Sequence, residues 1–378
     1  MPYNKYMTAS RKTALLALLL LTAPSLKAEA DVKFGLPYPL EMSVAFGQKD
    51  GAVIYETPFS KKPAEDYDTV LVQGDMPDPA MQVNLTIKAR NFFSAGADFK
   101  QTAFRRFPNG RFWAKYTVPL TRQPLKLRVL NTGARTGSRL AIYEAEIFVA
   151  RAIKEAPAPQ GPLPLVTEPA ISVPETAPFK LVRRSGWQAQ PPTQLYTWHE
   201  PYFFTLHHTQ GNYPRTYEAA VSEVQFVQDY HQHAKGWIDI GYHFLVDPAG
   251  NIFEGRPILA EGAHVVKHNP GNIGISILGN YHPPVSNQFT PAAEASFVAV
   301  GRYLKDTYAV NVSSFYAHRD IGNTDCPGDD LYAKKTGLSA LIFTPQDLPV
   351  PVNPTDAPPM TPAQQKSLDQ LEKYLTQK

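Results

Sequence analysis

The chain has 378 residues, a formal net charge of +3 and 43% hydrophobic residues. A charge so close to zero gives no case for a nucleic-acid partner, and the length predicts more than one domain. There are ten histidines but one cysteine, Cys326, so no disulfide can form within the chain.

The first thirty residues have the layout of a secretory signal peptide. A polar, positively charged start leads into the apolar run TALLALLLLTA, which is too short to span a bilayer comfortably. Small residues follow at Ala28 and Ala30, and we expect cleavage after one of them. The mature protein is then exported, to the periplasm or outside the cell; an uncleaved anchor is the alternative. No later segment is apolar enough to cross a membrane, so we expect no stable membrane insertion.

Two proline-rich stretches divide the rest of the chain. APAPQGPLPLVTEPAISVPETAP has the composition of an extended, semi-rigid linker, and TPQDLPVPVNPTDAPPMTP is a second such stretch. They predict a first domain over residues 31–152, a linker over 153–178, a second domain over 179–342 and a tail over 343–378. The tail is expected to contain one short amphipathic helix.

The first domain has the pattern of an all-β sandwich. VNLTIKAR, LKLRV and YEAEIFV alternate apolar and polar residues with period two, and turn signals such as FPNG separate them. In YEAEIFV the alternation predicts that Tyr143, Ala145, Ile147 and Val149 share one face. Phe112 and Trp113 are candidates for stacking on sugar rings if they are exposed, but a core or edge position is favoured.

The second domain mixes strands and helices. YFFTL has the composition of a buried strand, YHFLVD and NIFEG predict two strands around the turn PAGN, and NIGISILG predicts another. TYEAAVSEVQFVQDYHQHA has apolar residues at helical spacing. A further helix is expected to begin with Thr290 as N-cap and Pro291 in the first helical position. Strands interleaved with helices predict an α/β domain.

All ten histidines lie within residues 199–318, and this clustering suggests a metal site. The candidates are His207 and His208 at the end of one strand, then His318 and Cys326. Neighbours on a strand point to opposite faces, so only one of the two adjacent histidines is expected to bind an ion. Zinc accepts imidazole nitrogen and thiolate, and coordination explains a lone cysteine in an oxidising compartment. A buried free thiol remains open as the alternative.

Five ordered motifs within about residues 180–335 resemble one known family. LVRRSGWQA, LHHTQG, GWIDIGYHFLVDPAGNIFEGR, EGAHVVKHNPGNIGISILGNY and AHRDIGNTDCPG are similar to segments of the peptidoglycan recognition proteins and phage-lysozyme-type N-acetylmuramoyl-L-alanine amidases. The resemblance implies a mixed central sheet flanked by helices. It also implies zinc-dependent hydrolysis of the amide bond between N-acetylmuramic acid and L-alanine in peptidoglycan.

The resemblance also implies which residues hold the zinc ion. The first histidine of the HHT-type motif is the family's ligand, which selects His207 over His208. His318 and Cys326 match the other two ligands. Three protein ligands leave one tetrahedral position open, as in catalytic zinc sites, where the ion activates a water molecule.

Four more positions match the family's active site. Tyr242 falls on the active-site tyrosine, and Thr324 falls two residues before the cysteine, where its hydroxyl can stabilise an oxyanion. A phenol with a pKa of about 10 is a poor base at pH 7, so the general base is left open. His264 and Asn272 fall where the family lines its substrate groove, with loop hydrogen bonding as the alternative.

Two other functions are weighed against the amidase. The first alternative is a peptidoglycan-binding module without activity. The second is a thiol hydrolase with Cys326 as nucleophile and His318 as base. The complete ligand set argues against the first, and the metal-type motifs argue against the second. For the all-β domain we hypothesise that it positions the enzyme on the cell wall.

Overall fold

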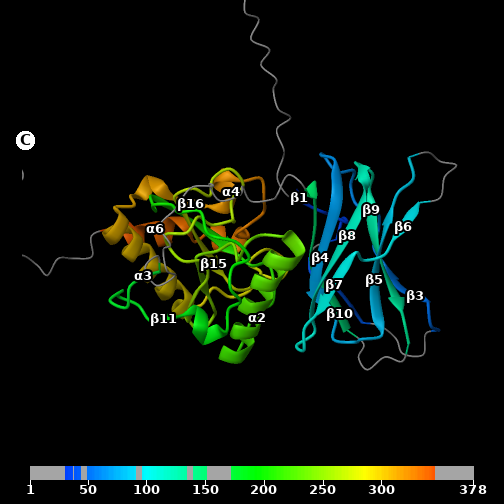
Figure 1. The fold of residues 1–378 in the computed structure, drawn as a ribbon, viewed down its shortest axis with the longest axis horizontal. Helices are drawn as coiled ribbons and strands as arrows, with labels where there is room; N and C mark the ends of the chain where they lie inside the picture. The colour runs from blue at the N-terminus through cyan, green and yellow to red at the C-terminus, as the bar shows by residue number, and fades with distance from the viewer. Residues whose placement is uncertain are drawn as a thin grey trace, which may run out of the picture. The chain divides into compact units, whose positions relative to one another are not determined.

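The computed structural model describes residues 30–36, 38–43, 49–90, 96–133, 139–150 and 172–344. The chain divides into two compact units, Met1–Glu155 and Ala156–Lys378 (Figure 1). Most of the expected signal peptide and the whole expected tail helix lie outside the described residues. Within the described ranges, no helix combines the length and hydrophobicity needed to span a membrane.

The first unit consists of two antiparallel sheets, which confirms the predicted all-β fold. One sheet has the order β1-β10-β4-β8-β7 with β2 paired to β10, and the other has the order β3-β9-β5-β6. Valine, leucine and isoleucine side chains from both sheets form one buried core. The strands are β1 (Ala30–Asp31), β2 (Leu40–Ser43), β3 (Val53–Glu56), β4 (Tyr67–Asp75), β5 (Met81–Ile87), β6 (Ala97–Phe99), β7 (Ala103–Arg106), β8 (Arg111–Thr121), β9 (Leu125–Asn131) and β10 (Arg139–Phe148).

Strand β10 corrects one detail of the sequence analysis. Its pairing with β4 shifts register between Ile142 and Glu144, so a β-bulge interrupts the alternation there. Ala145 belongs to the core, as does Ile142 before the bulge, whereas Tyr143 does not. The predicted face therefore holds for Ala145 and Ile147 and fails at Tyr143, while Val149 follows the end of the strand.

Phe112 and Trp113 are both buried within β8. Neither ring is available to stack on a sugar, so the core position favoured from the sequence holds for both.

The second unit is built on one mixed sheet with the order β11-β14-β13-β15-β12-β16. All pairings are parallel except the hairpin of β13 and β14. The fully buried β12 lies between β15 and β16, as expected for a strand whose two faces are both covered. The strands are β11 (Leu181–Val182), β12 (Phe203–His208), β13 (Phe244–Val246), β14 (Ile252–Glu254), β15 (Asn272–Ile277) and β16 (Phe315–Ala317).

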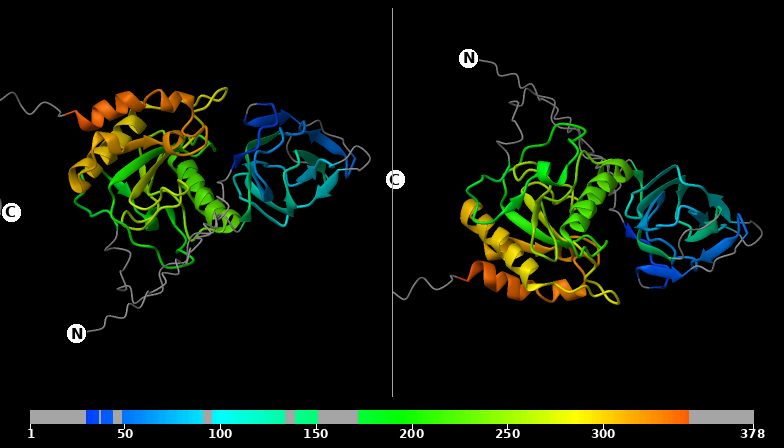
Figure 2. Two further views of the ribbon diagram at one scale, coloured as in Figure 1. Left: turned by 90° about the horizontal axis from the view of Figure 1, so that it is seen from above. Right: turned by 90° about the horizontal axis from the view of Figure 1, so that it is seen from below.

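Helices cover both faces of this sheet, which confirms the predicted α/β class. Helices α3 and α6 lie on one side and α2 on the other (Figure 2). Phe297 and Leu304 of α3 and Ile342 of α6 join Phe204 of β12 in the buried core. The helices are α2 (Tyr217–Asp229), α3 (Pro291–Tyr308), α4 (His318–Ile321), α5 (Asp329–Tyr332) and α6 (Lys335–Phe343), with the 3-10 turns η2 (Arg184–Trp187) and η4 (Val312–Ser314).

The ends of two helices can be compared with the sequence analysis. Thr290 caps α3 by accepting a hydrogen bond from the backbone N–H of Ala293, and Pro291 follows it in the first turn, as predicted. Helix α2 does not simply stop. It widens into the π-helical turn η3 (Tyr230–Lys235), which ends at Gly236 with a φ of 78°.

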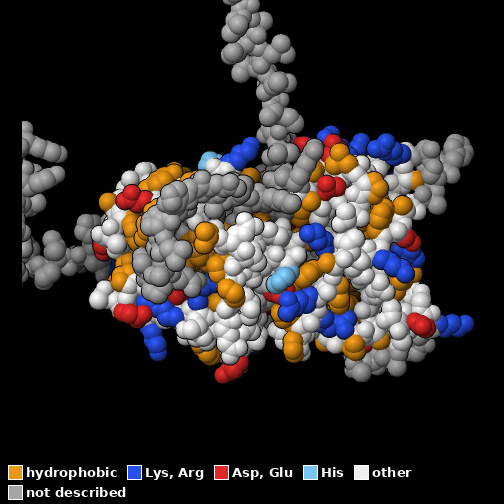
Figure 3. All heavy atoms as spheres, viewed as in Figure 1, with side chains coloured by type: hydrophobic (Ala, Val, Ile, Leu, Met, Phe, Trp, Pro, Cys, Tyr) orange, Lys and Arg blue, Asp and Glu red, His pale blue; other side chains and the backbone are white. Residues whose placement is uncertain are grey.

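The surface carries no dominant charge of one sign on the face drawn in Figure 3, where Lys and Arg side chains form several separate groups. This distribution agrees with the small net charge of +3. A nearly neutral chain lacks the strong field that steers polyanions to a protein.

Candidate metal centre

The two histidine donors meet because two parallel strands lie side by side. β16 pairs with β12 in parallel, with Leu206 opposite Ala317. The next residues along the two strands are His207 and His318, so both lie at the carboxyl edge of the sheet. Their ring centroids are 4.6 Å apart.

The neighbouring His208 points to the opposite face of β12. It is buried there, and its Nδ1 accepts a hydrogen bond of 3.2 Å from the backbone N–H of Tyr281. The strand geometry thus separates the two adjacent histidines, and among the described residues only His207 joins a cluster of metal-type donors.

The third donor, Cys326, is held by a tight loop after α4. Gly328 adopts a φ of 90°, and a Cβ there would lie 2.3 Å from the carbonyl oxygen of Tyr281, so only glycine fits. The backbone N–H of His208 donates to the Cys326 Sγ at 3.4 Å. The same sulfur lies 3.7 Å from Nδ1 of His207.

These three side chains fit a zinc ion. Their donor atoms all lie within 4.8 Å of one another. Zinc–nitrogen bonds of about 2.1 Å and zinc–sulfur bonds of about 2.3 Å require donor atoms roughly 3.3–3.8 Å apart in a tetrahedron. The 3.7 Å between the Cys326 Sγ and His207 Nδ1 meets that requirement. Two imidazoles and one thiolate leave a fourth position for water or substrate.

Burial keeps the histidine donors neutral. It lowers the pKa of His318 to about 4, and the positive charge of Lys235 adds to the effect. Burial also lowers the pKa of His207 well below its ordinary value, with repulsion from His318 and His264 contributing. A metal binds the neutral imidazole, so both side chains are in the binding form at neutral pH.

His264 and Asn272 lie behind the metal centre. The Nδ1 of His264 is 3.0 Å from the Nε2 of His207, and its Nε2 is 3.1 Å from the carbonyl oxygen of Asn272. Asn272 is fully buried; its side chain accepts from Thr205 and donates to the carbonyl of His268. The expected groove-lining role does not suit this placement of Asn272, because its side chain has no surface to offer a substrate.

Tyr242 and Thr324 are more exposed than His264 and Asn272. Both are half-buried. The ring centroid of Tyr242 is 5.2 Å from that of His207. The hydroxyl of Thr324 accepts a hydrogen bond of 3.1 Å from the backbone N–H of Cys326, which leaves its own proton free to donate.

Comparison with known proteins agrees with this geometry. The family model described as N-acetylmuramoyl-L-alanine amidase matches residues 197–329. Peptidoglycan-recognition protein SC2 of Drosophila melanogaster is 40% identical over 132 residues, which are 34% of this chain and 70% of that protein. The chain belongs to the peptidoglycan recognition protein and type 2 amidase family. Peptidoglycan recognition protein 1 of Bos taurus is 37% identical over 134 residues, covering 34% of this chain and 68% of that protein.

Among solved structures, the N-acetylmuramoyl-L-alanine amidase LysC of Clostridium intestinale URNW aligns with a TM-score of 0.36 and 27% identity, over 42% of this chain and 96% of that one. The family domain lies within the second unit, and its cluster of His207, His318 and Cys326 is consistent with the zinc site of the family.

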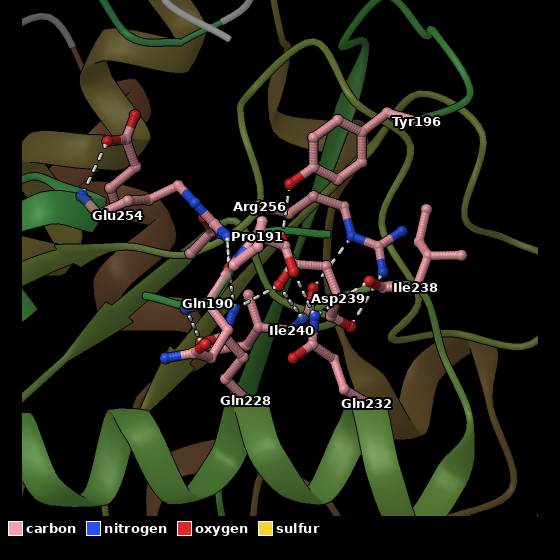
Figure 4. A network of polar contacts seen from close by, with 12 residues as sticks. Gln190, Pro191, Tyr196, Gln228, Gln232, Ile238, Asp239, Ile240, Glu254 and Arg256 are labelled. Atoms are coloured by element: carbon pink, nitrogen blue, oxygen red, sulfur yellow. Dashed lines mark hydrogen bonds and ion pairs between the residues drawn. The ribbon is translucent and has the colours of Figure 1, made fainter. Parts of the chain in front are cut away.

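A buried polar network supports the irregular segment that carries the family's tyrosine position. Asp239 is fully buried and lies at its centre (Figure 4). Its carboxylate is 2.9 Å from the Arg184 guanidinium and accepts hydrogen bonds from Tyr196 and Gln228 at 2.6 and 2.7 Å. Every oxygen of this buried charge is thereby paired, as a buried carboxylate requires.

Arg256 holds the backbone on the other side of the same segment. Its guanidinium donates to the carbonyls of Asp239, Ile240 and Glu261 at 3.2, 3.0 and 2.6 Å. Its backbone N–H donates to the carbonyl of Tyr242 at 2.8 Å. The segment has no regular ladder of its own, so these bonds fix its course.

The sequence analysis did not single out three residues near this site. The Nδ1 of His231 accepts from the backbone N–H of Gly241 at 3.0 Å, and its ring lies 5.5 Å from that of Tyr242. The ammonium of Lys235 lies 5.0 Å from the ring centroid of Trp237. The clustering of histidines pointed to this region, but the π-helical turn that carries His231 and Lys235 has no sequence signature.

Proposed function

We propose that the second unit is a zinc-dependent amidase that cleaves the bond between N-acetylmuramic acid and L-alanine in peptidoglycan. The observation that carries the proposal is the convergence of His207, His318 and Cys326 within 4.8 Å, in a chain of this amidase family. These three residues would hold the ion. When bound, zinc supplies Lewis-acid activation of water and of the amide carbonyl.

The chain's own residues then orient the reactants. The Tyr242 ring lies beside His207 and is half-buried, and these two observations support assigning its hydroxyl the role of orienting the attacking water by a hydrogen bond. Thr324 is anchored by the Cys326 backbone and can donate its hydroxyl proton to the oxygen of the substrate carbonyl as negative charge develops there. Both roles need only a hydrogen bond, and neither needs a shifted pKa.

The proposed partner is peptidoglycan, in keeping with the names of the related peptidoglycan recognition proteins. We also propose that the protein is exported, because the signal-like start of the chain would deliver it to the compartment where peptidoglycan lies.

Product analysis tests the proposal. Purified peptidoglycan is incubated with the protein, with the chelator-treated protein, and with the treated protein after zinc is restored. New L-alanine N-termini should appear, vanish on chelation and return with zinc. Release that ignores the chelator would support a thiol hydrolase using Cys326. Binding to the wall without any release would support a recognition module without activity.

A further inference from the structure

His207 can bind an ion through Nδ1 only if its proton sits on Nε2. An imidazole that carries one proton has one donor and one acceptor nitrogen. The Nδ1 of His207 faces the Cys326 sulfur at 3.7 Å, which is the side of the ion. The opposite nitrogen, Nε2, faces His264 at 3.0 Å.

The direction of the hydrogen bonds behind His207 follows from one carbonyl. The backbone oxygen of Asn272 can only accept, so the Nε2 of His264, 3.1 Å away, must donate to it. A neutral His264 with its proton on Nε2 has an acceptor at Nδ1. The Nε2 of His207 must then donate to that acceptor, which leaves the lone pair of His207 on Nδ1.

We propose that His264 is a positioning residue that fixes the tautomer and the ring orientation of His207 for metal binding. The inference rests on the proposed zinc site and adds a residue to it. Ligand histidines commonly donate their second N–H to a carboxylate, carbonyl or water, and that partner sets the tautomer. Here the partner is the neutral imidazole of His264. Its own tautomer is fixed by the hydrogen bond that it donates to the Asn272 carbonyl.

The fold holds the His264 ring in one place. A Cβ at Gly262 would lie 2.5 Å from its ring, and a Cβ at Gly274 would lie 2.7 Å from it, so two glycines make the slot. The backbone N–H of His264 donates to the Asn269 side chain at 2.9 Å. Asn272, which accepts the last hydrogen bond, is the first residue of β15, in register with β12.

Two substitutions separate this role from simple packing. His264→Phe fills the slot but can neither accept from His207 nor donate to Asn272. His264→Gln offers a carbonyl oxygen to His207 and an amide N–H to Asn272, so it restores both bonds. We expect the zinc affinity to fall about 10- to 100-fold in the Phe variant and to recover most of that loss in the Gln variant. A chelator competition titration measures both.

His199→Phe is the matched control. His199 is buried and has the same pattern, because Gly271 donates to its Nδ1 at 2.9 Å and its Nε2 bonds the Ile258 carbonyl at 3.0 Å. That variant loses two equivalent bonds away from the ligands, so its zinc affinity should stay at the wild-type value. Equal zinc affinity in wild type and His264→Phe, or equal losses in the Phe and Gln variants, would overturn the proposal.

A spectrum of the unmodified protein decides the matter if the variants do not fold. In the zinc-loaded chain labelled with nitrogen-15, long-range proton–nitrogen spectra should show His207 protonated on Nε2 and His264 protonated on Nε2. A proton on Nδ1 of either ring would refute the proposed chain of hydrogen bonds from His207 through His264 to Asn272. A wild-type chain that bound no zinc would instead contradict the proposed function. A chain that bound zinc but had no amidase activity would contradict the proposed activity and not the role of His264.

Discussion

At the scale of single residues, the lone cysteine of the chain is explained by its surroundings. Cys326 is buried, its sulfur accepts from the His208 backbone, and it lies 3.7 Å from Nδ1 of His207. A buried thiolate needs a compensating charge, which a zinc ion at the proposed site would supply.

Replacing Cys326 by serine should therefore remove the metal. We expect the zinc affinity of Cys326→Ser to fall by more than about 100-fold, since even partners outside the ligand shell cost 10- to 100-fold. Amidase activity should disappear with the ion. Metal content after gel filtration, set against Ser314→Ala in the exposed turn η4, checks this; a variant that kept its zinc would remove Cys326 from the ligand set.

Tyr242 should affect the rate and leave the metal in place. Tyr242→Phe removes only the hydroxyl, so we expect kcat to fall about 100-fold with unchanged zinc content. Tyr316→Phe is the control, since that half-buried tyrosine of β16 packs on Phe203 of β12. Wild-type kcat in Tyr242→Phe would show that the hydroxyl takes no part.

At the scale of elements, strong local patterns predicted the structure well and weak ones did not. The alternating and continuous apolar runs gave β9, β12 and β15, and the Thr-Pro start gave α3. The bulge in β10 was missed because an inserted residue leaves no mark in an apolar pattern. β11 and β16 have two and three residues, too few for any period to show.

The candidate site was predicted only in part, because local patterns identify residue types and spacing but not long-range contacts. Spacing and residue type narrowed the ligands to four candidates, and the family resemblance chose among them. The contact between His207 and His264, and the one between Arg184 and Asp239, join residues more than fifty positions apart. Such contacts depend on the register of strands and loops, which a single sequence does not display.

The buried network gives a prediction at this scale. Asp239→Asn keeps the shape of the side chain but leaves the Arg184 guanidinium without its charge partner. Breaking a buried pair in this way should destabilise the second unit by about 3 kcal/mol. Urea unfolding measures it, with Glu175→Gln as control, because Glu175 pairs with Arg183 at the exposed surface and should cost less than about 1 kcal/mol. Equal effects of the two changes would contradict the assigned role of the network.

At the scale of the whole molecule, each unit has its own hydrophobic core. A chain that lacks residues 1–150 should therefore fold, bind zinc and cleave soluble muropeptides with a kcat within about twofold of the full chain. If the all-β unit positions the enzyme on the wall, the truncated chain should sediment less with purified walls. Sedimentation equal to that of the full chain would count against that hypothesis.

Buried histidines also make the stability of the metal-free protein depend on pH. Burial lowers the pKa of His318 to about 4 and that of His208 and of His264 to about 3, from 6.5. Between these values the unfolded chain binds more protons than the folded one, so stability falls as the pH drops from about 6.5 toward 3. Unfolding midpoints of the metal-free chain, measured from pH 7.5 down to 4, should decrease throughout; a flat profile would refute this.

The order of the ligands along the chain sets when the site can exist. His207 is the last residue but one of an interior strand, whereas His318 and Cys326 follow about 110 to 120 residues later, after β16 in the chain. No short segment contains the three donors, so a partly made or partly folded chain offers only isolated side chains to an ion. At the proposed zinc site, metal uptake would then be a late event that requires a folded domain, and the fraction of chains carrying zinc would report the fraction that folded completely.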